Sequence, residues 1–418
     1  MSSTQREEAA RALMGVLPGR AMDLARLQRL VDGCAPVVTV IGKYNHGKSS
    51  LLNELIGQDA FAVSDKRETV SLSDSQRNGV RWLDAPGLDA DVGTDDDRHA
   101  LHAAWLESDI RLFVHAAKEG ELDAKELELL AELQADGART TRQTVFVLSQ
   151  VDQLADDTEL HHVSRAIDEQ VPGIVLNTVS SVRHRKGIEG GKKLLLERSG
   201  IPVLHDMLNA ALLRVPTARV HETQLLFSEI GAELHRLKTR QQELLDGRRE
   251  TQTRERSDFD RGLQAVLVKV GADIEAMLDA LTTNHAEVPD TAKDAYAITA
   301  GKRERAYLQI AYSRACIEID SFLAGHGVTG LPSEQQTVAR ALNSVMIAVM
   351  GVSVKFRKDL HRMFCEPAGR ERLQGEFAHY YELSNDRQAL RKQIADAEIA
   401  VAASNKASMP LDILRDAR

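Results

Sequence analysis

The chain has 418 residues and a formal charge of -9, and its length corresponds to about two to four domains. Apolar residues make up 43% of it, which is enough to bury a sizeable core. A net acidic chain is a poor candidate for sequence-independent binding to nucleic acid, which needs a basic face, so no nucleic-acid partner is expected. Aromatic residues make up only 4%, which argues against a large β-sandwich and suits long helices.

The cysteines and the N-terminal residues indicate a compartment. Cys34, Cys316 and Cys365 are far apart, so they form neither a metal-binding pattern nor a disulfide framework, and a reducing environment fits them. The first residues are polar and charged, without the apolar core of a signal peptide. No window has 18 uncharged apolar residues. We therefore expect a cytoplasmic protein, with a peripheral position at the inner membrane surface as a further expectation.

The chain begins with predicted helices. Leu13 and Val16 are spaced as on one helix face, and so are Leu24 and Leu27, which predicts one or two helices over residues 4–32. Pro18-Gly19 provides a break between them. We expect residues 1–34 to form N-terminal helices that pack with the later helical region.

Residues 35–213 alternate between short β-rich runs and helical segments. The predicted strands are Val37–Ile41, Val80–Leu83, Ile110–Val114, Thr144–Leu148 and Ile174–Thr178. The predicted helices between them include residues 48–57, 96–106, 122–136 and 158–170. Apolar strands that alternate with helices are typical of an α/β domain with a mostly parallel sheet.

The strand signal disappears in residues 214–418, which we expect to form an all-α helical bundle or stalk. Apolar residues step by three and four from Phe227 to Leu244 and again from Leu373 to Val401. Such seams occur in an ordinary bundle and in a long stalk, and the sequence leaves both open. Further helices are predicted within residues 258–284, 290–323 and 334–363.

A phosphate-binding loop (P-loop) pattern follows the first predicted strand. The loop reads Gly42-Lys43-Tyr44-Asn45-His46-Gly47-Lys48-Ser49, which fits G-x-x-x-x-G-K-[ST], and Ser50 opens a helix. Glycines let successive backbone N–H groups face an anion, and the helix start adds its positive dipole end. Lys48 is expected to reach the β- and γ-phosphates, and Ser49 to offer its hydroxyl to Mg²⁺.

Two further segments are candidates for the phosphate and magnesium end of the site. Asp84 and Gly87 form a D-x-x-G pattern after the predicted strand Val80–Leu83, where Asp84 can hold Mg²⁺ through water and the Gly87 N–H can approach the γ-phosphate. Thr69 lies 20 residues after Ser49 and is a candidate switch threonine that closes on Mg²⁺. The predicted metal ligands are thus Ser49, Thr69 and Asp84.

The base-reading end is less regular. Ser149, Gln150 and Asp152 stand where a guanine-reading [NT]-K-x-D pattern is expected, but Ser replaces Asn or Thr and Gln replaces Lys. A carboxylate at Asp152 accepts from guanine N1 and N2 together, a donor pair that adenine lacks. Ser180 and Ser181 follow the last predicted strand and fit a loop that contacts the base. The predicted nucleotide-binding residues are Gly42, Asn45, His46, Gly47, Lys48, Ser49, Ser50, Asp84, Gly87, Gln150, Asp152, Ser180 and Ser181.

Together these residues resemble the Era, septin and dynamin branch of the P-loop GTPases. The stretch from Gly42 to Gly57 is similar to the G-x-[FY]-x-x-G-K-S-[ST]-L-[IL]-N-x-L-[IL]-G pattern of bacterial dynamin-like proteins, and the resemblance covers roughly residues 35–213. It implies binding of GTP, GDP and Mg²⁺, GTP hydrolysis, membrane remodelling, and self-association or pairing with a related GTPase through the GTPase domain. The expected catalytic residues are Lys48, Ser49, Thr69 and Gly87.

The sequence departs from the family where the attacking water is positioned. Dynamins carry Gln and then Ser at the places of Tyr44 and Asn45, and Leu88 stands where Ras-like proteins have a catalytic Gln. Asn45 and His46 are candidates for this role, with a purely loop-shaping role as the alternative. Turnover is therefore expected to be slow, to need a second GTPase domain, or to be absent.

One stretch of the helical region is a candidate for contact with a lipid surface. Val345, Met346, Val349 and Met350 are followed by the basic residues Lys355, Arg357 and Lys358. An apolar helix with a basic border can lie in a lipid interface, whereas the alternative is a buried helix of the bundle. Three functions stay open: a dynamin-like mechanoenzyme, a soluble regulatory GTPase whose helices bind a protein, and a pseudo-GTPase assembly subunit.

Overall fold

The computed structural model describes residues 3–63, 73–85, 103–291, 294, 296–339 and 342–416. These residues divide into two compact units. The first comprises Met1–Leu237 and Ala403–Arg418, and the second comprises Lys238–Ala402. Both divisions fall inside helices, α10 (Val215–Asp279) and α15 (Asn385–Lys406). The domain limits predicted after residues 34 and 213 remain predictions.

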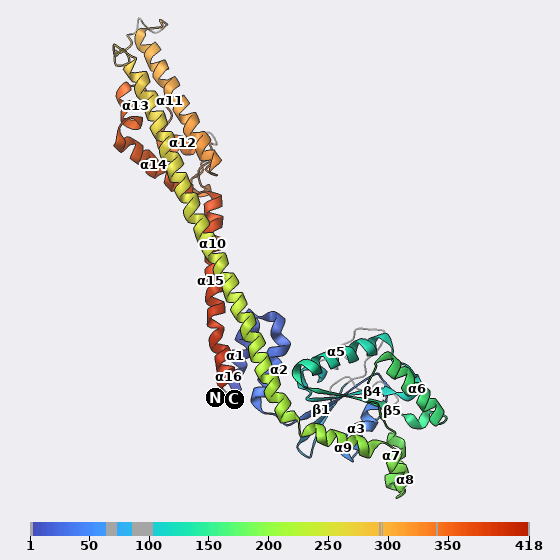
Figure 1. Ribbon diagram of the computed structural model, residues 1–418. Helices are drawn as coiled ribbons and strands as arrows, with labels where there is room; N and C mark the ends of the chain where they lie inside the picture. The colour runs from blue at the N-terminus through green and yellow to red at the C-terminus, as the bar shows by residue number, and fades with distance from the viewer. Residues whose placement is uncertain are drawn as a thin grey trace. The chain divides into compact units, whose positions relative to one another are not determined.

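The first unit contains a six-stranded sheet of order β2-β3-β1-β4-β5-β6 (Figure 1). Its strands are β1 (Val37–Ile41), β2 (Ser73–Arg77), β3 (Val80–Asp84), β4 (Ile110–Ala116), β5 (Gln143–Ser149) and β6 (Asn177–Thr178). Every neighbouring pair is parallel except β2 and β3, so the predicted mostly parallel sheet is confirmed.

The two edge strands differ from the prediction. The sequence analysis missed β2 because its Ser-Asp-Ser-Gln-Arg sequence has no apolar residue, and an edge strand needs no buried side chains. An Asn78-Gly79 turn joins it to β3, and both residues have the positive φ that a tight hairpin turn requires. At the opposite edge, β6 has two residues instead of the five predicted over Ile174–Thr178.

Helices cover both faces of the sheet (Figure 1). Residues of α3 (Lys48–Ile56) and α9 (Ile201–Leu212) share one core with β1 and β4. Residues of α5 (Ala124–Thr140) and α6 (Asp157–Gln170) share the core of the other face. Because both faces are covered, all seven residues of β4 are buried. Two shorter helices, α7 (Ser181–Glu189) and α8 (Lys193–Glu197), lie between β6 and α9 in the chain.

A separate core joins the N-terminal helices to α10. Its helices are α1 (Ser3–Val16), α2 (Ala21–Asp32), the first part of α10, and α16 (Ser408–Asp416). Leu13, Leu24, Phe227 and Leu414 are among its buried residues. The predicted helices over residues 4–32 are therefore confirmed, with the break at η1 (Pro18–Arg20).

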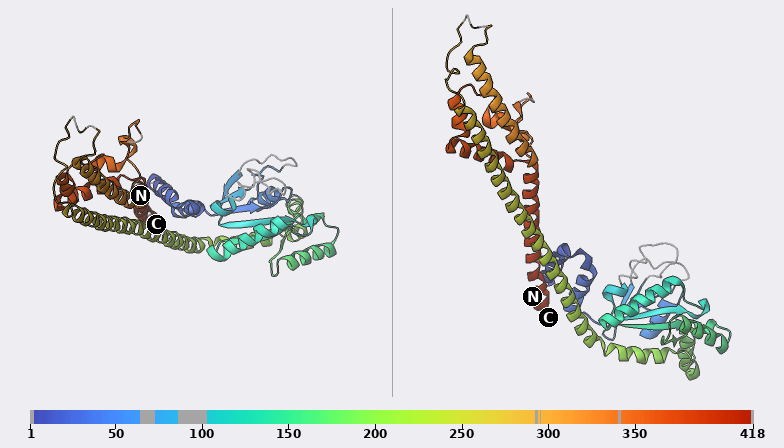
Figure 2. Two further views of the ribbon diagram at one scale, coloured as in Figure 1. Left: turned by 90° about the horizontal axis from the view of Figure 1, so that it is seen from above. Right: turned by 45° about the horizontal axis from the view of Figure 1, so that its top comes forward.

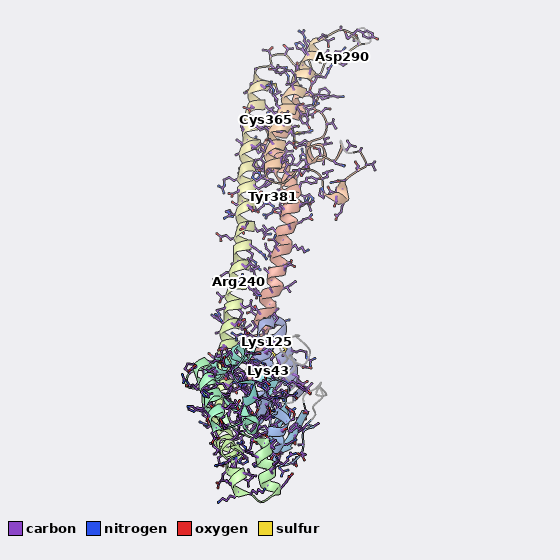
Figure 3. All side chains as sticks on the ribbon, turned by 90° about the vertical axis from the view of Figure 1, so that its right-hand side faces the viewer. Lys43, Lys125, Arg240, Asp290, Cys365 and Tyr381 are labelled. Carbon is purple, nitrogen blue, oxygen red and sulfur yellow. The ribbon has the colours of Figure 1, made fainter. Side chains whose placement is uncertain are left out.

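The regular secondary structure of the second unit consists of helices within its described residues. Besides α10 and α15 it contains α11 (Ala300–Gly325), α12 (Val345–Met350), α13 (Arg357–Phe364) and α14 (Pro367–Glu382). Phe259 and Tyr381 stack in its core with ring centroids 4.0 Å apart (Figure 3 labels Tyr381). Here α10 and α15 lie side by side, and Arg249 pairs with Glu398 between them (Figures 1 and 2). The prediction that Leu244 belongs to the apolar face of this helix is wrong, because Leu244 is exposed and Leu245 is buried instead.

The stretch proposed for lipid contact belongs to this core. Val345, Met346, Val349 and Met350 are all less than 8% exposed, and the Tyr312 hydroxyl donates to the Met350 carbonyl oxygen over 3.0 Å. The structure thus favours the alternative of a buried bundle helix.

The basic residues that follow have mixed environments. Arg357 pairs with Glu304 over 2.6 Å and donates to the Leu281 carbonyl, while Lys355 and Lys358 are exposed. None of the described helices is both long and apolar enough to cross a bilayer.

Candidate nucleotide-binding site

The P-loop connects the end of β1 to the start of α3, as its sequence predicts. A Cβ at Gly42 would lie 2.2 Å from the Val114 carbonyl oxygen on the neighbouring strand, so only glycine fits. Gly47 is the N-cap of α3 and has a φ of +80°, a conformation that side chains rarely adopt. Asn45 also has a positive φ, which asparagine tolerates better than most residues. The loop therefore has the tight backbone curvature of an anion nest.

Lys48 is the first residue of α3, and its ammonium group is directed back to the loop. Its Nζ donates to the Lys43 carbonyl oxygen over 2.9 Å. Burial lowers the pKa of Lys48 to about 8, although the charge of Asp84 acts in the opposite direction. The first N–H groups of α3, at Lys48, Ser49 and Ser50, have no partner within the helix. The Lys48 ammonium group and these amide N–H groups together form a positively charged site that suits the phosphates of a nucleotide.

The predicted magnesium ligands Ser49 and Asp84 lie together. The Ser49 hydroxyl donates to Asp84 Oδ2 over 2.5 Å, although the residues are 35 positions apart. Asp84 Oδ1 is buried and has no hydrogen-bond partner among the described residues. Burial also raises the pKa of Asp84, outweighing the effects of Ser49 and Lys48. A hydroxyl beside an unsatisfied carboxylate oxygen fits a hard cation such as Mg²⁺.

The residues that replace the guanine-reading Asn and Lys hold the P-loop in place. Ser149, at the end of β5, donates through its hydroxyl to the His46 carbonyl oxygen over 2.6 Å. Gln150 adopts a positive φ and its Nε2 donates to the Asn45 carbonyl oxygen over 2.6 Å. The substitutions therefore keep two contacts between the base-reading segment and the loop.

Asp152 and Ser180, both predicted to contact the base, lie against each other. The Ser180 hydroxyl donates to Asp152 Oδ1 over 2.6 Å and accepts from the Arg183 N–H as the N-cap of α7. Ser181 is the first residue of that helix. Since Ser180 occupies one carboxylate oxygen, the other is available to a base.

His46 faces a buried cluster. Its imidazole is 3% exposed, its Nδ1 lies 3.3 Å from the Val114 carbonyl oxygen, and its ring lies edge-on to that of His115. Burial lowers the pKa of His46 to about 4, so the ring is neutral at physiological pH. These contacts favour the alternative in which His46 shapes the loop. Thr69 and Gly87, predicted on the switch segments, lie outside the described residues.

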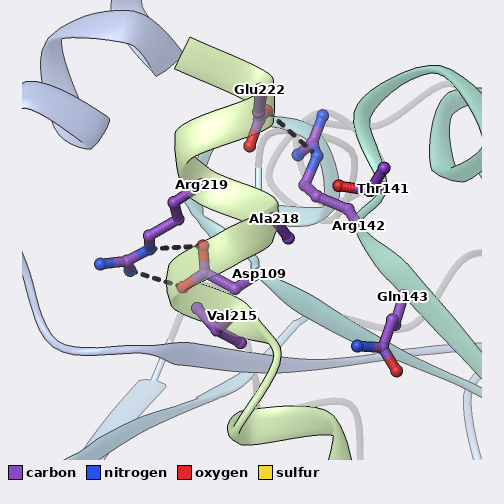
Figure 4. A pocket seen from close by; sticks show the side chains of 8 residues that line it. All are labelled: Asp109, Thr141, Arg142, Gln143, Val215, Ala218, Arg219 and Glu222. Atoms are coloured by element: carbon purple, nitrogen blue, oxygen red, sulfur yellow. Dashed lines mark hydrogen bonds and ion pairs between the residues drawn. The ribbon is translucent and has the colours of Figure 1, made fainter. Parts of the chain in front are cut away.

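A buried ion network, which the sequence analysis missed, holds the start of α10 against the sheet (Figure 4). Arg219 pairs with Asp109 over 2.6 Å, and Arg142 pairs with Glu222 over 3.2 Å. Arg26 of α2 contacts both carboxylates, Glu222 at 2.8 Å and Asp109 at 3.0 Å. Burial raises the pKa of Asp109, but the hydrogen bond from Arg219 and the charge of Arg26 outweigh it, so the pKa is lowered. Because these residues are far apart in the sequence, they form no local motif from which the network could be predicted.

Comparison with known proteins identifies the class of the first unit. A protein-family model described as 50S ribosome-binding GTPase matches residues 37–150, which include the P-loop, Asp84 and Gln150. Over 100 residues, about a fifth of each chain, the sequence is 32% identical to GTPase Der of Streptococcus mutans. With the geometry above, these matches define a GTP-binding domain of the P-loop GTPase class.

A longer match defines the family of the whole chain. The sequence is 49% identical over 389 residues to an uncharacterized protein of Acinetobacter baylyi, and the match covers 93% of each chain. The chain belongs to the same family as that protein. Among solved structures, it is similar to the LeoA bacterial dynamin GTPase from ETEC over 99% of this chain and 97% of that one, with 13% identity and a TM-score of 0.33.

Proposed function

We propose that this protein hydrolyses GTP with the help of Mg²⁺, and that the nucleotide state controls its self-association and its remodelling of a lipid surface. The observation that carries the nucleotide part is the P-loop, closed by Lys48 and held by Ser149 and Gln150. The proposal places the protein in the cytoplasm, at the inner surface of the membrane.

The chemistry follows from the charges at the loop. Lys48 and the N–H groups at the start of α3 neutralise the phosphates, while Ser49 and Asp84 hold Mg²⁺. The ion, when bound, offsets charge on the β- and γ-phosphate oxygens. Water attacks the γ-phosphate in line, and positioning and electrostatics lower the barrier without a protein nucleophile. Thr69 and Gly87 remain predictions for this step.

Calorimetry with the intact chain tests nucleotide binding. We expect magnesium-dependent uptake of GTP and GDP, much weaker uptake of ATP, and loss of binding in Lys48→Ala. Lys118→Ala is the matched control, because Lys118 is an exposed lysine outside the loop and should leave binding unchanged. Absence of guanine-nucleotide uptake by the unmodified chain would remove the proposal.

Self-association is tested by turnover. The rate of GTP hydrolysis per molecule should rise with protein concentration if two GTPase domains complete each other's site. A constant rate would support a GTPase that acts as a monomer. Binding without multiple turnover would support the alternative of a pseudo-GTPase assembly subunit, and a nucleotide-dependent complex with another protein would support a soluble regulatory GTPase.

The lipid contact needs large exposed apolar side chains, whereas the four residues of α12 predicted for it are buried. The segment between α10 and α11 supplies them: Val288 is 56% exposed, Ile298 79%, and Tyr296 fully exposed (Figure 3 labels Asp290 in this segment). Asp290 accepts from the Thr299 hydroxyl over 2.9 Å, which ties the segment to the start of α11. Apolar and aromatic side chains in a connecting segment suit insertion at a lipid interface.

Co-sedimentation with vesicles of mixed neutral and anionic lipid tests this contact. Ile298→Asp should reduce binding of the full chain, whereas Ile399→Asp should not, since Ile399 is equally apolar and 68% exposed but stands on α15. No binding to vesicles with or without GTP would remove the membrane part of the proposal and leave the GTPase part standing.

A further inference from the structure

A buried cluster of three potential metal ligands lies beside the P-loop and is separate from the magnesium residues. It consists of His46 of the loop, His115 near the end of β4, and Glu126 in the first turn of α5. All three are at most 3% exposed. One ligand atom from each residue lies within 4.8 Å of the others. Since buried ionisable groups are costly unless they are paired, this grouping requires a physical reason.

The distances fit a small tetrahedral ion. Ligands about 2.1 Å from a zinc ion stand about 3.4 Å apart in a tetrahedron. Glu126 Oε1 lies 2.9 Å from His115 Nδ1 and 3.8 Å from His46 Nδ1. These two separations bracket the ideal value, so small side-chain rotations suffice. The Val114 carbonyl oxygen lies 3.3 Å from His46 Nδ1, a separation that also suits a fourth donor.

Both ring nitrogens of His115 lie next to hydrogen-bond acceptors. Its Nε2 lies 3.2 Å from the Gly120 carbonyl oxygen, and its Nδ1 lies 2.9 Å from Glu126 Oε1. Both partners are acceptors, and a neutral imidazole has only one N–H. When Nε2 donates to Gly120, the lone pair of Nδ1 therefore faces a carboxylate oxygen. In this tautomer, a metal ion between the two atoms satisfies both of them, as a second proton would.

The surroundings have the supporting contacts that metal sites use. The Nε2 contact with Gly120 fixes the orientation of the His115 ring, as a backbone carbonyl commonly does for a metal-binding histidine. The second oxygen of Glu126 accepts from the Asp123 N–H over 3.1 Å and lies 3.2 Å from Lys43 Nζ. Lys43 also pairs with Asp123, so its charge is already balanced. Glu126 Oε1 is thus directed at the two histidines.

We propose that His46, His115 and Glu126 bind a zinc ion that joins the P-loop to β4 and α5. Two imidazole nitrogens and one carboxylate oxygen are ligands that zinc prefers. The ion is structural, because its ligands are buried, and it differs from the magnesium of the nucleotide site, whose ligands are Ser49 and Asp84. Its charge lies beside a loop built for an anion, so it supports phosphate binding without touching the phosphates.

Metal analysis of the full-length chain tests the proposal. After dialysis against a chelator and re-equilibration with Zn²⁺ in the absence of nucleotide, the protein should retain about one zinc ion per chain. Glu126→Gln and His115→Ala should each lower zinc affinity at least about tenfold. The control is His161→Ala, an exposed histidine of α6, which should retain the ion. Wild-type protein that retains no zinc would overturn the proposal and indicate that a proton bridges His115 and Glu126.

A second measurement does not depend on the folding of buried variants. Co²⁺ added to the metal-free wild-type chain should produce the visible absorption of a tetrahedral nitrogen-oxygen site, and Zn²⁺ should abolish it. Absence of this band would also overturn the proposal. A chain that binds GTP but no zinc refutes only the zinc site, whereas a chain that binds zinc but no GTP refutes only the proposed function.

Discussion

The nucleotide site and the core of the second unit are stabilised in different ways. At the nucleotide site, polar groups with named partners hold one loop, and each contact has a fixed geometry. In the second unit, apolar side chains such as Phe259 and Phe377 fill a common core. A polar motif in the sequence identifies the particular residues that carry the chemistry. An apolar helix face indicates only that the face is buried, and does not say which partner buries it. Experiments that damage one region and spare the other make this comparison quantitative.

The largest effect is expected from Phe377→Ala in the core of the second unit. Phe377 is fully buried, and truncating such a side chain costs about 3–5 kcal/mol through lost burial and the cavity that remains. Urea unfolding should report this loss. Calorimetry should find GTP affinity unchanged, because Phe377 has no part in the nucleotide site. A matched loss of GTP affinity would show that the two regions are not independent. Ile399→Ala, at an exposed position, is the control for stability.

A similar effect is expected from Asp109→Asn in the first unit. The change leaves Arg26 and Arg219 with one carboxylate fewer, and removing one partner of a buried ion pair costs about 3–5 kcal/mol. Asp74→Asn is the control, since Asp74 is half-exposed and pairs with Arg81, where about 0–1 kcal/mol is expected. Equal losses in the two variants would contradict the assignment of the network as a buried tie between α10 and the sheet.

The pH dependence of stability gives a second test of Asp109. Its pKa in the folded protein is below the ordinary value, so its contribution is complete above the unfolded pKa of about 3.9 and is lost as the pH falls through the folded pKa. The stability difference between wild type and Asp109→Asn should therefore be constant from pH 5 to pH 8 and shrink below about pH 4. A difference that changes between pH 5 and pH 8 would assign the effect to another group.

A smaller effect is expected from Gln150→Ala. The change removes one hydrogen bond to the Asn45 carbonyl oxygen, worth about 1 kcal/mol, so GTP affinity should fall about fivefold. Gln150→Lys, which restores the residue of the family pattern, should bind GTP at least as tightly as wild type. Unchanged affinity in Gln150→Ala would mean that the contact does not hold the loop when nucleotide is bound.

The site was only partly predictable from the sequence. Lys48, Ser49 and Asp84 lie together, as the sequence indicated, because the ends of parallel strands meet at one edge of a sheet, and Asp152 lies beside Ser180. Their roles toward nucleotide remain predictions. The ion network of Arg26, Asp109, Arg142 and Glu222 was not predicted, since it joins four distant segments and each residue alone is typical of a solvent-exposed surface. The cluster of His46, His115 and Glu126 was not predicted either, because its three residues come from separate segments of the chain.

The helical region was predicted less completely. The sequence indicated helices over most of it, but α10 continues from Val215 to Asp279 through a charged stretch that has no apolar seam. It also left the position of Val349 open between lipid and core. The decision depends on two long-range contacts that no local pattern shows. The Tyr312 hydroxyl donates to the Met350 carbonyl oxygen, and Arg357 donates to the Leu281 carbonyl oxygen.

The smallest effect is expected from Ser180→Ala, and it falls on selectivity. Ser180 donates to Asp152 Oδ1 over 2.6 Å, and in the proposed function this contact orients the carboxylate toward the guanine N1 and N2 donors. Without it the carboxylate rotates more freely, and the ratio of GTP to ATP affinity should fall by a few-fold, corresponding to about 0.5–1.5 kcal/mol. Because Ser180 also caps α7, a purely structural loss would weaken GTP and ATP binding equally. Ser180→Thr keeps both the hydroxyl and the cap and should retain the wild-type ratio. A ratio that stays constant in Ser180→Ala while both affinities fall would assign Ser180 to the helix cap alone and leave Asp152 to read guanine unaided.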